Sequence, residues 1–150
     1  MNRELEQLAN TINLAAPAQR RLRLLFGHAC ASRVSQNLEA DAAIAAFLAF
    51  GDYLAGRLDD AAFDALGQQI LQVANQHPGS RSLDGSQHAA VSATYALANA
   101  INGRALEAAS YAAYSKVYGY GGYAVNDPDA FAEEHAAQVQ ILQDLLTSPR

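Results

Sequence analysis

The chain of 150 residues has no tryptophan, one cysteine and one lysine. With Cys30 alone, no internal disulfide bond can form. Nine arginines and Lys116 carry the positive charge, and the formal net charge is −5. Because affinity for phosphate backbones comes from clustered Lys and Arg side chains, this balance argues against DNA or RNA as a partner.

Long hydrophobic runs are also missing. No apolar stretch approaches the roughly 20 residues that a membrane-spanning helix needs. The first residues, MNRELEQLANTINL, are polar and amphipathic and lack the apolar centre of a signal peptide. We therefore expect a cytoplasmic protein that does not bind membranes.

The usual signatures of catalysis and of metal or cofactor binding are absent too. The sequence HExxH does not occur, and no two of the four histidines are four residues apart: His28, His77, His88 and His135. His28 and Cys30 are two residues apart on an expected helix, so they point in different directions and cannot form a dyad. The glycines at 119, 121 and 122 do not spell a dinucleotide-binding motif and follow a helix rather than a strand. We expect no catalytic residue, no metal and no cofactor.

What the chain does have is helical periodicity along nearly its whole length. Apolar residues recur at three- and four-residue spacing, as in Leu5, Leu8 and Ile12, and no segment alternates like a strand. The pattern predicts an all-α, single-domain bundle of about seven helices over residues 1–150. Residues that favour helix starts occur at Pro17, at Asp41, at Asp59 or Asp60, and at Asp127–Pro128. Residues 77–85 read as a loop. The alanine-rich helices over 86–101 and 104–118 should form the central hairpin, because small side chains let helices approach closely.

The strongest functional signal is the segment YAAYSKVYGYGGY at residues 111–123. It holds five of the seven tyrosines, which we predict to bind a partner: Tyr111, Tyr114, Tyr118, Tyr120 and Tyr123. Tyrosine mixed with glycine and serine is typical of recognition surfaces, since it offers a broad amphipathic contact at low rotamer cost. The alternative is that these rings complete the core and turn only their hydroxyls to water.

Acidic residues gather in the third and fourth predicted helices. We predict that Asp52, Asp59 and Asp60 form part of the partner-binding surface and attract a basic partner. The alternative is a solvated face in which several of these residues cap helices.

Arg33 lies beside an apolar stripe and needs a carboxylate partner. Glu39 or Asp41 could supply it, and we predict a structural ion pair with Asp41.

Three segments resemble the Imm5-type immunity proteins of bacterial polymorphic toxin systems. They are HACASRVSQNLEADAAIAAFLAFGDYLAG (28–56), HAAVSATYALANAINGRALEAASYAAYSKVYGY (88–120) and EEHAAQVQILQDLL (133–146), the last with Glu134 and Gln138 at matching spacing. The resemblance covers roughly residues 18–146, although the chain lacks the tryptophan that many such proteins carry. It implies a protein that binds and occludes a cognate toxin without chemistry of its own. Toxins that attack nucleic acid are commonly basic, which an acidic inhibitor would complement.

Two other interpretations stay open at this point. A pocket lined by His88, Tyr95, Tyr111 and Tyr114 would suit a small helical ligand-binding domain or an uncharacterised helical-bundle enzyme. A homodimer formed through the alanine-rich hairpin is also compatible with the sequence.

Overall fold

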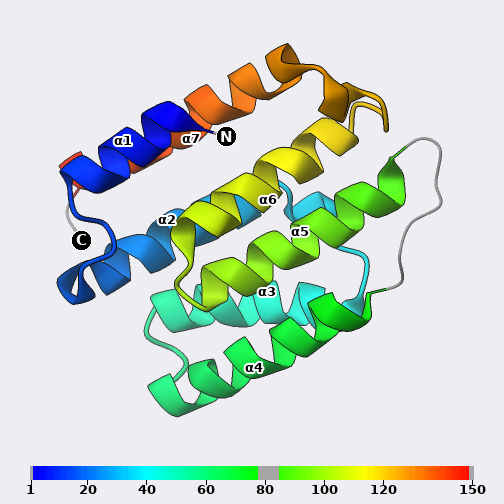
Figure 1. The fold of residues 1–150 in the computed structure, drawn as a ribbon. Helices are drawn as coiled ribbons and strands as arrows, with labels where there is room; N and C mark the ends of the chain where they lie inside the picture. Colours follow the sequence, from blue (N-terminus) through cyan, green and yellow to red (C-terminus); the bar gives the residue numbers. More distant parts are fainter. Residues whose placement is uncertain (1, 78–84, 149–150) are drawn as a thin grey trace.

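A computed structural model of the chain describes residues 2–77 and 85–148, and in this part the fold is a bundle of seven α-helices without strands (Figure 1). This confirms the predicted all-α class and helix number. The α-helices are α1 (Arg3–Thr11), α2 (Arg20–Ser32), α3 (Asp41–Leu54), α4 (Asp60–Gln76), α5 (Ser86–Ile101), α6 (Ala105–Tyr118) and α7 (Ala132–Thr147). Short 3-10 turns interrupt the connections at η1 (Pro17–Gln19), η2 (Ser35–Asn37), η3 (Ala124–Asn126) and η4 (Pro128–Phe131). Of the predicted loop over 77–85, residues 78–84 lie outside the described part.

Polar side chains define several helix starts. The Asn2 side chain accepts a hydrogen bond from the Leu5 amide, and the Asp59 carboxylate accepts one from the Ala62 amide at 2.8 Å. Such bonds satisfy amides that have no partner inside the helix. Asp41, predicted as a cap, is instead the first residue of α3, with Ala40 in the capping position. There its charge can still favour the positive end of the helix dipole.

The predicted alanine hairpin lies at the centre of the bundle. α5 packs along α6, and both helices pack on α2, while α5 also contacts α4 (Figure 1). Their alanines are almost fully buried; Ala96, Ala100, Ala108 and Ala112 are 0% exposed. Helices of the same chain therefore cover these alanines.

The remaining helices flank this centre. α3 and α4 pair on one side, and α1 and α7 lie side by side on the other (Figure 1). α7 also reaches α2 and α6, which brings the last helix against the middle of the bundle. None of the helices in the described part combines the length and apolar character needed to cross a membrane.

Candidate functional site

Three of the predicted tyrosines share one face of α6. Tyr111, Tyr114 and Tyr118 are separated by three and four residues, the spacing that aligns side chains along a helix. The opposite face of α6 carries the buried alanines, so the tyrosines face outward. Tyr111 is 38% exposed and Tyr114 is 44% exposed, while Tyr118 is half-buried. The core alternative is therefore wrong for Tyr111 and Tyr114.

Rings from neighbouring elements extend this surface. Tyr95 of α5 stacks on Tyr111 with ring centroids 5.3 Å apart, and His88 of α5 stacks on Tyr118 at 4.9 Å. Tyr114 meets Phe131 of η4 edge to face at 5.2 Å. We call this surface the aromatic face; it consists of His88, Tyr95, Tyr111, Tyr114, Tyr118 and Phe131. Phe131 ends the 3-10 turn that precedes α7 and is half-buried beside Tyr114.

Tyr120 and Tyr123 follow the end of α6 and are 55% and 81% exposed. The backbone beside them packs closely on Gly85, which has φ +84. A Cβ atom at position 85 would lie 2.7 Å from the Tyr118 carbonyl oxygen and 3.0 Å from the Gly122 nitrogen. Only glycine allows both the left-handed backbone and this approach. The two tyrosines line a hollow next to Tyr118, the last residue of α6.

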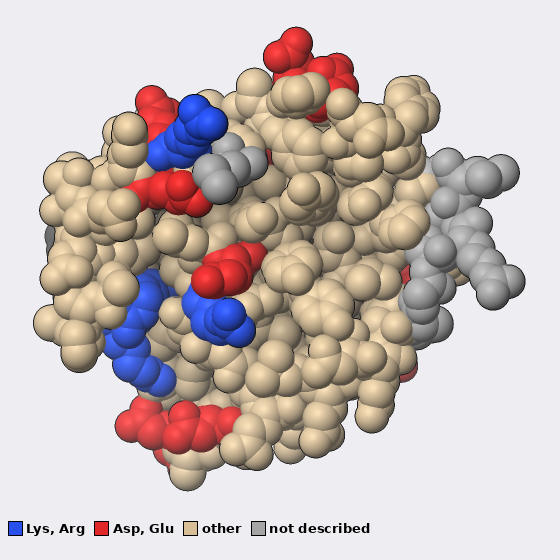
Figure 2. Space-filling view, in the orientation of Figure 1, with Lys and Arg blue, Asp and Glu red and all other residues tan. Residues whose placement is uncertain are grey.

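The predicted acidic residues lie elsewhere. Asp52 pairs with Arg57 at 3.1 Å, Asp59 caps α4, and Asp60 accepts a hydrogen bond from the Tyr53 hydroxyl. Asp52 lies in the last turn of α3, and Asp59 and Asp60 lie at the start of α4. The connection of these helices is at the lower left of Figure 1, whereas the segment after α6 lies at the upper right. Figure 2 shows few charged side chains over α5 and the second half of α6. The structure therefore does not bring the acidic residues and the tyrosines into one surface.

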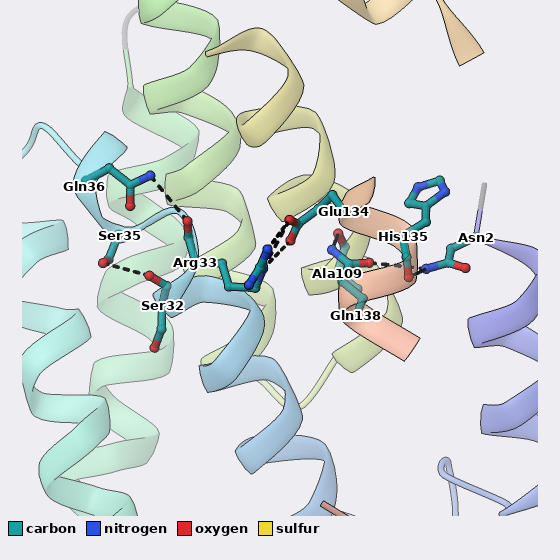
Figure 3. Close-up of polar contacts among 9 residues, drawn as sticks. All are labelled: Asn2, Ser32, Arg33, Ser35, Gln36, Ala109, Glu134, His135 and Gln138. Carbon is teal, nitrogen blue, oxygen red and sulfur yellow. Dashed lines mark hydrogen bonds and ion pairs between the residues drawn. The ribbon is translucent and has the colours of Figure 1, made fainter. Parts of the chain in front are cut away.

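The predicted pair of Arg33 and Asp41 is wrong. Arg33 follows the end of α2 and forms a bidentate ion pair with Glu134 of α7, with Nε–Oε2 and Nη2–Oε1 distances of 2.8 Å (Figure 3). Glu134 is 3% exposed, so the pair satisfies a buried charge. Sequence proximity favoured Asp41, but the packing of α7 on α2 brings a carboxylate from the far end of the chain. These hydrogen bonds raise the pKa of the Arg33 guanidinium.

A second buried polar residue lies one turn further along α7. Gln138 is 1% exposed, and its Nε2 donates to the Ala109 carbonyl of α6 at 2.8 Å (Figure 3). Asn2 Nδ2 donates to the His135 carbonyl at 3.1 Å and makes a longer bond of 3.5 Å to Gln138 Oε1. Glu134 and Gln138 thus attach α7 to α2, α6 and the start of α1.

The described residues contain no group of three His, Cys, Asp or Glu side chains that could hold a metal ion. Two histidines have shifted pKa values, and neither is paired with a nucleophile. Burial lowers the pKa of His28, which stacks on Phe47. Burial and the charge of the amino terminus lower the pKa of His135. Cys30 is fully buried, and burial raises its thiol pKa. What the exposed rings offer is stacking and hydroxyl hydrogen bonds.

In the described residues, the four rings that we predicted to line one pocket, His88, Tyr95, Tyr111 and Tyr114, make different contacts. Tyr95 and Tyr111 stack directly on each other, and the Tyr95 hydroxyl donates to Asn75 Oδ1 at 3.0 Å. Tyr114 turns toward Phe131 and lines a separate groove beside α1 and α7, which does not include the other three residues.

Comparison of the chain with protein-family models, with curated proteins and with solved structures found no match.

Proposed function

We propose that this protein binds another protein through the aromatic face and the exposed tyrosines Tyr120 and Tyr123. The observation that carries the proposal is the exposure of tyrosines whose packing within the chain is incomplete: Tyr111, Tyr114, Tyr120 and Tyr123 are 38%, 44%, 55% and 81% exposed. Tyrosine is enriched among the residues that dominate binding energy at protein interfaces. A surface with rings at its centre and few charges is typical of an interface core.

The partner we propose is a basic bacterial toxin, which the protein would neutralise by occlusion. Two observations support this choice: the resemblance of three segments to immunity proteins, and a net charge of −5 that attracts a basic partner. Asp52, Asp59 and Asp60 lie away from the aromatic face, so they would contribute through the long-range field rather than by contact. Inhibition by occlusion requires no catalytic group and no cofactor.

A growth assay tests the proposal. The neighbouring gene product would be expressed in a bacterial host, alone and with this protein. We expect the neighbour to arrest growth and the wild-type protein to restore it. A variant with Tyr111, Tyr114, Tyr120 and Tyr123 changed to alanine should fail to restore growth while keeping its helical circular dichroism signal.

The matched control is Leu48→Ala on the outer side of α3. Leu48 is 64% exposed, so this variant removes an exposed apolar side chain far from the aromatic face. It should protect as well as the wild type. Full protection by the four-tyrosine variant would contradict the assignment of the interface, and a neighbour that does not arrest growth would contradict the toxin as partner.

A further inference from the structure

A groove of about 530 Å³ runs beside the aromatic face, between α1, α6, α7 and the η3–η4 connection. Its volume lies in the range of small-ligand sites. Tyr114 lines the groove and also contacts Tyr118, so the groove is continuous with the aromatic face. A partner that covers the aromatic face would therefore reach the groove as well.

The walls of the groove combine apolar and aromatic residues with polar ones. Leu5 and Leu106 face it from α1 and α6, and Val125 and Phe131 from the η3–η4 connection. Among the residues that the structure describes, the lining has no Lys or Arg, and Glu6 is its one carboxylate. Glu6 follows Leu5 in α1, is half-buried and also lines the groove. His135 also lines the groove, and burial lowers its pKa, which favours the neutral imidazole. A cation would be attracted to the Glu6 carboxylate and to the faces of the rings.

Gln138 supplies a polar acceptor at the groove. Its side-chain nitrogen is engaged by the Ala109 carbonyl at 2.8 Å, which fixes the orientation of the amide. Its Oε1 receives the 3.5 Å bond from Asn2, at the long limit for a hydrogen bond. This oxygen is therefore a buried acceptor with capacity for a stronger donor. Guanidinium and ammonium groups are such donors.

We propose that the groove binds a basic side chain of the partner protein, with its stem along Leu5, Leu106 and Phe131 and its cationic head between Glu6 and Gln138. Arginine and lysine combine an apolar stem with a charged head in this manner. The inference rests on the proposed function, because it names the group that the partner inserts. It also explains how an interface with few charges on its aromatic face can select a basic partner.

The experiment uses a small cation in place of the partner. Benzylguanidinium carries an arginine-like head on an apolar stem, and benzylurea is its neutral counterpart of the same shape. Each would be titrated into ¹⁵N-labelled protein while amide resonances are followed by NMR. We expect both to shift the amides of Leu5, Leu106 and Phe131, with benzylguanidinium binding about fivefold or more tightly, as for one partly screened charge pair.

Two variants of α1 isolate the carboxylate. Glu6→Gln should reduce the preference for benzylguanidinium over benzylurea to about twofold or less, and the ring faces account for what remains. Glu4→Gln removes the same charge from the same helix at an exposed position outside the lining, and it should keep the preference. The amino terminus is identical in all three proteins, so its charge does not affect the comparison.

Equal binding of the two probes to the wild type would overturn the inference, and so would shifts that map away from the groove or an unchanged preference in Glu6→Gln. These outcomes leave the growth assay untouched, since that assay uses no probe and, of its four tyrosines, only Tyr114 lines the groove. Conversely, loss of protection in the tyrosine variant with no probe binding would support the interface and reject the groove as the site of a basic side chain.

Discussion

Arg33 and Glu134 are 101 residues apart in the sequence and form a bidentate ion pair between the end of α2 and the first turns of α7. Glu134 is 3% exposed, whereas the Arg33 side chain is 35% exposed, so water reaches only one partner. The pair attaches α7 to the bundle one turn before Gln138, and Gln138 lines the groove. It therefore fixes a helix on which part of the candidate site depends.

Removing Arg33 should destabilise the protein strongly. Arg33→Ala leaves the Glu134 carboxylate buried without its partner, and we expect a loss of about 2–4 kcal/mol, less than for a wholly buried pair because Arg33 is partly screened by water. Urea unfolding followed by circular dichroism measures this loss. Arg57→Ala, which breaks the exposed pair with Asp52, should change stability by no more than about 1 kcal/mol. Equal effects of the two variants would show that the buried pair has no special role.

Two helical glycines should respond to alanine in opposite directions. A Cβ atom on Gly27 would lie 2.9 Å from the Ala100 Cβ and 3.1 Å from its Cα, so Gly27→Ala must push α2 away from α5 and should cost roughly 1–3 kcal/mol. At Gly51 the nearest atom would be His28 Nε2 at 3.7 Å, an ordinary contact. Gly51→Ala should be neutral or stabilising by up to about 1 kcal/mol, because alanine favours helix. Thermal unfolding of both variants tests the close α2–α5 packing.

The exposed tyrosines should be dispensable for folding. Tyr120→Ala and Tyr123→Ala remove rings that are 55% and 81% exposed, so we expect changes within about 0.5 kcal/mol. Tyr118→Ala should cost more, roughly 1–2 kcal/mol, since Tyr118 is half-buried and stacks on His88. Melting curves of the three variants provide the comparison. Unfolding of the Tyr120 or Tyr123 variant would place that ring in the core and remove it from the interface.

Stability should fall as the pH drops below the ordinary histidine pKa of 6.5. Burial lowers the pKa of His28, so the unfolded chain binds a proton more readily than the folded one. Neutral His28 therefore contributes its full share to the free energy of unfolding above pH 6.5, and this share is lost as the pH falls toward the lowered pKa of the folded state. The pKa of His135 is also lowered, so protonation of His135 destabilises the fold in the same pH direction. His28→Phe keeps a ring against Phe47 and should lose less stability between about pH 7.5 and 5.5. Parallel curves for wild type and variant would contradict this role.

Cys30 should be inert in the folded protein. Burial raises its thiol pKa, and the nearby charge of Glu134 adds to this effect, so little reactive thiolate forms. An aromatic disulfide reagent added to the native protein should react far more slowly than in urea. Rapid labelling without unfolding would show that the region around Arg33 and Glu134 opens locally.

By itself, the sequence determined the helices and their number. The helices follow from local signals, because hydrogen bonding and steric fit within each segment determine where a helix forms. These signals are the three- and four-residue apolar spacing, Asp59 at the start of α4, Gly56 after α3 and the alanines of α5 and α6. The same spacing placed Tyr111, Tyr114 and Tyr118 on one helical face. It could not show that this face is exposed, since a tyrosine stripe suits a core equally well.

Only the tertiary structure decided which distant groups meet. The partner of Arg33 is Glu134 rather than Asp41, which is nearer in the sequence. The packing of the helices, and not the distance along the chain, brings a carboxylate to the half-buried guanidinium. The groove depends in the same way on α1, α6 and α7 converging around Gln138. Contacts between segments so far apart follow from the packing of whole helices, which the pattern of each single helix does not contain.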